Sequence, residues 1–265
     1  MKRHSIWLAF VVSAAMALAG YRSGSTATAA AASEKHWSYE TAGDAVGPEG
    51  WGTLAGNATC SIGKSQSPVA LVFSQATPTP GKLGFRYLAT PLKVVNNGHT
   101  VQVNVGPGSS VEVGGTSYAL AQFHFHSPSE HTLDGKSFPM EMHLVHLGAD
   151  GKPALVVGVF IEEGAPSAAL GSFFANLPKT KGANSEPAGV SVDPGAILPV
   201  SRAFLNYAGS LTVPPCSEGI RWYVLTTPVS ASAAQIAAYR AAGLDHTNRP
   251  TQPFNTRPLF KSTTP

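Results

Sequence analysis

Charged side chains are scarce in this sequence of 265 residues. Asp, Glu, Lys and Arg make up 12% of it, about half the usual share, whereas hydrophobic residues make up 43%. Intrinsically disordered chains need the opposite balance, so a disordered protein is excluded. The basic residues form no run beyond the first three positions. Without a clustered basic face, nucleic-acid binding loses its main driving force, and we expect no nucleic-acid partner.

Long apolar segments are also lacking, with one exception at the N-terminus. Met1 to His4 is short and positive, and Ile6 to Gly20 is an apolar run shorter than the roughly 20 residues that span a bilayer. Small residues follow, with cleavage sites at Ala17 to Ala19 or at Ala27 to Ala32. This layout is typical of a secretory signal peptide, and a buried N-terminal helix is the alternative. We predict a leader over residues 1–32 and an exported, soluble domain over residues 33–265, with no membrane contact after leader removal.

Cysteine is limited to Cys60 and Cys216. In an oxidising compartment the two could pair, and two unpaired buried thiols are the alternative. Neither has a second Cys or a His at metal-ligand spacing, so a cysteine zinc site is not expected.

Glycine and proline are plentiful, at 27 and 21 residues, which favours many short strands over a helical bundle. Alternating or continuous apolar runs predict strands at 93–95, 100–105, 111–113, 118–126, 140–147, 154–161 and 220–225. Two helices are expected at about 168–176 and 232–242, the second ending at Gly243. We predict a single β-dominated α+β domain around a large, mostly antiparallel central sheet, with a few short surface helices.

The most informative histidines are His124 and His126. Residues two apart in a strand point to the same face, so both imidazoles project together while Phe123 and Phe125 face the core. Two imidazoles on one face can share a metal ion, although neighbouring histidines on strands often only form hydrogen bonds.

A second predicted strand supplies a third ligand. His143 and His146 are three residues apart and face opposite sides, so only one of them can join the site, and Glu141 lies on the same face as His143. Three neutral imidazoles and an open position describe a catalytic zinc site. A competing interpretation is a cupin-like metalloenzyme, in which Glu130 ligates iron or manganese. The glycines that flank that motif are absent here, where Tyr118 and Ser137 stand.

Ordered motifs over about residues 36–258 together resemble the α class of carbonic anhydrases, in particular the exported bacterial type. They are His36-Trp37-Ser38-Tyr39, Gly47-Pro48-Glu49, Gln66-Ser67-Pro68, Asn96 to Thr100, Gln122 to His126, Ser129 to His131, Glu141 to His146, Ser210 to Pro215, Trp222 and Asn248 to Pro253. In such members paired cysteines near positions 60 and 216 are usual.

The resemblance implies reversible hydration of carbon dioxide to bicarbonate and a proton, by attack of a zinc-bound hydroxide. It implies Zn2+ held by His124, His126 and His143, whose partners include Gln122 and Glu141. Thr212 would accept a hydrogen bond from the hydroxide and donate one to Glu130. From the residues alone, without this resemblance, Glu130 is interpreted as a carboxylate in a loop. His99 would be the proton shuttle, or otherwise a solvated turn histidine. The water network would comprise Tyr39, Asn97 and Gln102, and the substrate pocket would comprise Val145, Val156, Leu211, Thr212, Val213, Ile220 and Trp222.

The resemblance also implies partners and a compartment. The substrates are small molecules, carbon dioxide and bicarbonate, and sulfonamide and anion inhibitors are expected. A homodimer is common among bacterial members, and the periplasm or the extracellular space is the expected location. A catalytically silent binding domain of the same family remains the main alternative. Such domains typically lose a zinc histidine, whereas all three are present here.

Overall fold

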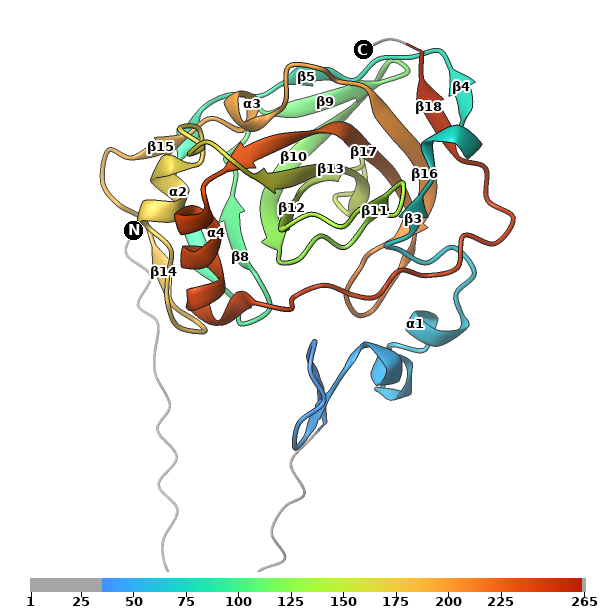
Figure 1. Cartoon of the computed structure of the whole chain (residues 1–265), viewed down its shortest axis with the longest axis horizontal. Coiled ribbons are helices and arrows are strands. Elements are labelled where there is room, and N and C mark those ends of the chain that lie inside the picture. The colour runs from blue at the N-terminus through green and yellow to red at the C-terminus, as the bar shows by residue number, and fades with distance from the viewer. Residues whose placement is uncertain (1–34, 264–265) are drawn as a thin grey trace, which may run out of the picture. The chain divides into compact units, whose positions relative to one another are not determined.

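A twelve-stranded sheet organises the computed structural model, which describes residues 35–263. The predicted leader, residues 1–32, lies outside the described residues. Along the sheet the strands follow the order β14-β7-β8-β10-β12-β13-β17-β16-β18-β4, and β9 pairs with β10 and β5 (Figure 1). Their bounds are β4 Thr77–Thr79, β5 Gly84–Arg86, β7 Val94–Asn96, β8 Val101–Asn104, β9 Ser110–Val113, β10 Thr116–His126, β12 Met140–Leu147, β13 Pro153–Glu163, β14 Asn184–Ser185, β16 Phe204–Ser210, β17 Glu218–Ala231 and β18 Phe260–Ser262.

Most neighbouring strands in this sheet are antiparallel, as predicted. Two pairs are parallel, β13 with β17 and β18 with β4, so the sheet is mixed. The apolar run of β13 is buried along most of its length because it lies between β12 and β17 and is covered on both faces. The β-dominated α+β class is therefore confirmed.

The two faces of the sheet pack into different core clusters. Phe123 and Phe125 are fully buried in the larger cluster, while Val145, Val156 and Trp222 belong to the second. This segregation follows from the alternation of side chains along each strand. It leaves His124 and His126, which alternate with the two phenylalanines along the strand, on the opposite face from the larger core.

Helices are few and short, and two of them lie where the sequence predicted helices. α2 spans Gly171–Ala175 and α4 spans Ala233–Tyr239, and the two contact each other (Figure 1). Ser232 and Gln235 form a reciprocal capping box at the start of α4. Both helices are shorter than predicted. A further turn, Arg240–Leu244, extends the α4 region through Gly243, which has a φ of 78°.

The remaining elements are short. The helical ones are η1 Pro48–Thr53, α1 Thr59–Ile62, η2 Phe73–Gln75 and α3 Pro194–Ile197, and the strands are β1 His36–Trp37, β2 Ala45–Val46, β3 Ala70–Leu71, β6 Thr90–Pro91, β11 Thr132–Leu133 and β15 Ser191–Val192. Of the helices in residues 35–263, none has the length and hydropathy needed to cross a bilayer.

A disulfide joins Cys60 in α1 to Cys216, which follows β16, and confirms the predicted pairing. The two residues are 156 positions apart. In the chain-entropy model, a disulfide that closes a loop of this length stabilises the folded protein by about 5 kcal/mol.

Reduction of this disulfide is expected to lower the melting temperature by about 10 °C or more, because the unfolded chain regains the entropy of the open loop. Thermal unfolding followed by circular dichroism with and without reductant measures the shift. A Cys60→Ala/Cys216→Ala variant, which reductant should not affect, is the control. Labelling of two free thiols in unreduced protein would contradict the bridge.

Candidate metal centre

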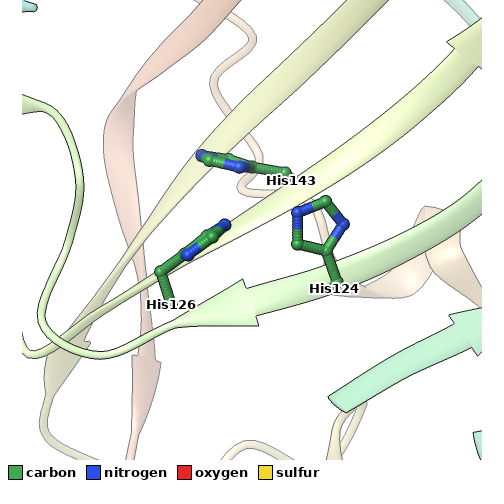
Figure 2. Close-up of side chains that lie close together, drawn as sticks. All are labelled: His124, His126 and His143. Atoms are coloured by element: carbon green, nitrogen blue, oxygen red, sulfur yellow. The ribbon is translucent and has the colours of Figure 1, made fainter. Parts of the chain in front are cut away.

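Two adjacent antiparallel strands carry three histidines close together. His124 and His126 alternate along β10, and the pairing register with β12 puts His143 opposite His124. One ring nitrogen from each histidine lies within 4.8 Å of those of the other two. Figure 2 shows the three rings grouped together, two of them on one strand. His146, three residues further along β12, packs instead against Tyr87.

In each of the three rings, the nitrogen that points away from the other two histidines donates a hydrogen bond. His124 Nδ1 lies 2.9 Å from Gln122 Oε1, His126 Nδ1 lies 2.6 Å from the carbonyl oxygen of Thr247, and His143 Nε2 lies 2.8 Å from Glu141 Oε1. All three partners are oxygens that only accept, so the named nitrogens carry the protons. In a neutral imidazole the remaining nitrogen then bears a lone pair, and three lone pairs are left for one site.

Burial keeps these imidazoles neutral. It lowers the pKa of His124 well below its usual value, and the neighbouring His126 and His143 lower it further. It lowers the pKa of His126 to about 4, against the hydrogen bond to Thr247. It also lowers the pKa of His143, although Glu141 opposes the shift. His126 Nε2 is buried and has no hydrogen-bond partner among the described residues. A buried, unprotonated nitrogen of this kind suits a metal cation.

Glu130 lies beside the three histidines. Its Oε2 is 3.5 Å from His126 Nε2 and 3.8 Å from His143 Nδ1, and its Oε1 accepts a hydrogen bond of 2.9 Å from the main-chain N–H of Arg249. The Thr212 side chain is also among the groups that lower the pKa of this carboxyl group, and Glu130 Oε2 has no hydrogen-bond partner among the described residues. Burial raises the pKa of Glu130 to about 7, with His143, the Arg249 hydrogen bond and Thr212 opposing it. A divalent cation held by the neighbouring imidazoles would favour the carboxylate form.

Glu141 accepts four hydrogen bonds. Its Oε1 accepts from His143 and from His131 Nδ1, and its Oε2 accepts from the main-chain N–H groups of Glu130 and His131. Burial opposes ionisation of this carboxyl group, yet His131 and His143 hold its pKa well below the usual value. Glu141 is therefore a carboxylate, fixed in place by the groups around it.

Two of these contacts were not predicted. The Thr247 carbonyl holds His126, and the Arg249 N–H holds Glu130. Both groups belong to the main chain, and no residue type marks them in the sequence. His131, by contrast, was visible in the motif that follows Glu130, although no contact was assigned to it.

His99 is half-buried against Trp37. The two rings are stacked, with centroids 3.7 Å apart and an interplanar angle of 17°. Burial lowers the pKa of His99, and the neighbouring Lys181 and His36 lower it further. The imidazole is therefore neutral at pH 7 and can accept a proton.

The three predicted water-network residues lie in different surroundings. Asn97 Oδ1 accepts from the main-chain N–H groups of the following turn, so its oxygen is used to hold that turn. Gln102 in β8 pairs in register with His124 and donates to an asparagine on its own strand. The Tyr39 ring lies 6.4 Å from the His126 ring, and burial raises the pKa of Tyr39 well above its usual value, so its hydroxyl stays protonated.

A cavity of about 230 Å³ adjoins His124 and His143. Of the predicted pocket residues, those that line it are Val145, Val156, Leu211, Thr212, Val213 and Trp222. Ile220 is not among the lining residues and packs with Val145 and Trp222 in the core. Pro153, the first residue of β13, lines the cavity and was not predicted.

Comparison with known proteins agrees with the sequence motifs. The family model of eukaryotic-type carbonic anhydrase matches residues 46–263. A carbonic anhydrase of Pectobacterium carotovorum is 40% identical over 232 residues, which is 87% of this chain and 92% of the relative. One from Neisseria gonorrhoeae is 40% identical over 240 residues, which is 89% of this chain and 92% of the relative.

Solved structures give the same result. The α-carbonic anhydrase of Thermovibrio ammonificans in complex with the inhibitor sulfanilamide has a TM-score of 0.80 and is 39% identical. The match covers 86% of this chain and 100% of that one. Dioscorin complexed with ascorbate has a TM-score of 0.77 and is 32% identical, and the match covers 86% of this chain and 98% of the dioscorin chain. The family predicted from the motifs is thus confirmed, and the chain belongs to the eukaryotic-type, or α, carbonic anhydrase family.

Proposed function

We propose that this protein catalyses the reversible hydration of carbon dioxide with a zinc ion held by His124, His126 and His143. The proposal rests on the three imidazoles. Each donates its one N–H to an oxygen acceptor and so keeps a lone pair on its second nitrogen. Three neutral nitrogen ligands with room for a further ligand are the donor set of catalytic zinc. Zinc in such a site lowers the pKa of a bound water to about 7, and carbonic anhydrase is the standard example of this effect.

Thr212 and Glu130 orient the attacking oxygen. Because the carboxylate can only accept, the Thr212 hydroxyl would donate to it, and only the lone pairs of the hydroxyl would then be left to face the cavity. The attacking oxygen must donate its own proton to Thr212, which turns a lone pair toward the substrate. The Arg249 N–H holds Glu130 in the orientation that this requires.

The cavity beside the histidines accommodates carbon dioxide. Its walls include Val145, Val156, Leu211 and Trp222, and these side chains offer an uncharged gas an apolar surface next to the reacting oxygen. Trp222 Nε1 donates to the carbonyl oxygen of Ser210, so the indole is held in one orientation as a wall. Bicarbonate, which is charged, is favoured less by these walls and is displaced by water.

His99 carries the product proton to solvent. Its lowered pKa keeps it able to accept a proton at neutral pH, and this capacity is lost as the pH falls through that pKa, below the usual 6.5. Its partly exposed position allows the proton to pass on to buffer.

Replacement of His99 by alanine is expected to lower kcat roughly tenfold or more at low buffer concentration, and to leave kcat/KM unchanged. The ratio kcat/KM reports the interconversion of carbon dioxide and bicarbonate, which does not require the proton to leave the protein. The constant kcat includes the release of one proton in each turnover. Stopped-flow hydration measures both constants, and added imidazole should restore kcat. His246→Ala, at an exposed histidine, is the control. Unchanged turnover of His99→Ala at low buffer would remove His99 as the shuttle.

Stopped-flow measurement of hydration on protein without residues 1–32 tests the proposed function. Activity should disappear when zinc is removed by a chelator, return when zinc is restored, and be inhibited by a sulfonamide such as sulfanilamide. A folded, zinc-loaded protein without hydration activity would overturn the proposal and favour a silent binding domain. Activity restored by iron or manganese but not by zinc would favour the cupin-like alternative.

We also propose export to the periplasm. The support is the disulfide, which is typical of oxidising compartments, the bacterial relatives, and the signal-peptide pattern of the first residues. Fractionation of cells that produce the full chain, with the N-terminus of the mature protein determined by mass spectrometry, tests both the location and the predicted leader.

A further inference from the structure

A chain of buried hydrogen bonds leads away from the metal centre on the side of Glu141. Glu141 Oε1 is 2.7 Å from His131 Nδ1, and His131 Nε2 is 2.7 Å from the Tyr207 hydroxyl. The hydroxyl is also 2.8 Å from Ser67 Oγ. His131 and Ser67 are 0% exposed and Tyr207 is 1% exposed, so these groups depend on one another for hydrogen bonds.

The direction of each hydrogen bond follows from the chemistry of the groups. Glu141 is a carboxylate that only accepts, so His131 Nδ1 is the donor in that contact. With its proton on Nδ1, the ring accepts at Nε2, and the partner that faces Nε2 is the Tyr207 hydroxyl. Tyr207 must therefore donate to His131 and accept from Ser67. The Ser67 Oγ is left to accept from the main-chain N–H of Ser210, which lies 3.0 Å away.

We propose that Tyr207 is a positioning residue for the metal centre. By donating to His131 Nε2, its hydroxyl keeps the proton of that ring on Nδ1, directed at Glu141. Glu141 thereby holds its carboxylate under His143 Nε2, so Tyr207 acts on a metal ligand through two intermediate side chains. The inference rests on the proposed function for the identity of the ion.

Replacement of Tyr207 by phenylalanine would remove the hydroxyl and show what it contributes. A phenylalanine would leave His131 Nε2 as a buried acceptor with no donor, which is unfavourable. With no partner at Nε2, the ring would lose one of the two hydrogen bonds that fix its position and could turn away from the Glu141 carboxylate. The weakened contact between His131 and Glu141 would let Glu141 shift and loosen His143. Outer partners of metal-bound histidines typically contribute about 10-fold to 100-fold to metal affinity.

The same hydroxyl also reaches the segment that carries Thr212. Ser67 and Ser210 bond reciprocally, with Ser67 N donating to Ser210 Oγ and Ser210 N donating to Ser67 Oγ. Ser210 ends β16, two residues before Thr212. Tyr207 thus links the histidine ligand to the strand end that leads into the residue we assign to orienting the attacking oxygen.

The test is the rate at which zinc passes from the holoprotein to an excess of chelator. Tyr207→Phe is expected to release zinc about tenfold faster than the wild type. Tyr87→Phe is the matched control, because its hydroxyl makes a 2.8 Å contact with the ring of another buried histidine, His146, which is not part of the site. It should release zinc at the wild-type rate, even if its melting temperature falls as far. Equal release from Tyr207→Phe and the wild type, or equal acceleration in both variants, would overturn the proposal.

A second measurement needs no variant and therefore does not depend on folding of a mutant. In 15N-histidine-labelled holoprotein, the NMR shifts of the His131 ring should report a proton on Nδ1 and none on Nε2. A proton on Nε2 would overturn the proposal. This readout also separates the two proposals: if the wild type neither binds zinc nor hydrates carbon dioxide, the proposed function fails, whereas a proton on His131 Nε2 would refute the role of Tyr207 alone.

Discussion

Replacement of His143 by alanine is expected to abolish zinc binding and carbon dioxide hydration together. The change removes one of three ligand nitrogens and also leaves Glu141 without one of its four hydrogen-bond donors. Because loss of an outer partner alone typically costs about 10-fold to 100-fold in metal affinity, loss of a ligand should exceed that range. Elemental analysis after dialysis measures the zinc content, and stopped flow measures the activity.

His146→Ala is the control for this variant. His146 lies on the same strand and is as deeply buried, but it packs against Tyr87. Both variants should lose stability, as large-to-small changes in a core do. Only the His143 variant should lose zinc. Full zinc retention by folded His143→Ala would defeat the ligand assignment.

Replacement of Glu130 by glutamine is expected to lower hydration on the order of 100-fold while zinc stays bound, a size typical of a single positioned polar group. The Arg249 N–H requires an acceptor, so the amide oxygen should take the place of Oε1. The NH2 group would then replace Oε2, which lies 3.5 Å from His126 Nε2. A donor would point into the site, and the proposed hydrogen bond from Thr212 would lose its acceptor oxygen.

Zinc content and kcat/KM, measured on the same preparation, distinguish this effect from loss of metal. Glu162→Gln provides a control at a half-buried glutamate of β13 that pairs with Lys136, and it should behave as the wild type. Wild-type kcat/KM in zinc-loaded Glu130→Gln would show that the carboxylate does not orient the attacking oxygen. Zinc loss from Glu130→Gln would instead favour the cupin-like ligand set, in which Glu130 binds the metal.

Much of the fold was accessible from local patterns. The alternation in residues 118–126 and 140–147 predicted two strands, which the structure contains as β10 and β12. Burial of Phe123 and Phe125, opposite the two histidines, followed from the same alternation. Such patterns are reliable because they depend only on strand geometry and on burial of one face.

Other elements had no such signal. β16 (Phe204–Ser210) was not predicted, because small and polar residues interrupt its apolar positions. α1 and α3 contain only four residues each, too few for a helical period to appear. α2 and α4 are shorter than predicted because tertiary packing rather than helix propensity determines where such short helices end.

The sequence by itself determined which residues can do the chemistry. Three histidines on two strands, two cysteines and a chain of family motifs were sufficient to predict the fold class, the disulfide and the family. Tertiary structure decided how these residues are held. The Thr247 carbonyl, the Arg249 N–H and the contact between His131 and Tyr207 join segments 76 to 121 positions apart. Such contacts depend on strand register and loop path, which set where main-chain groups and ring nitrogens meet, and a one-dimensional pattern of residue types does not encode those distances.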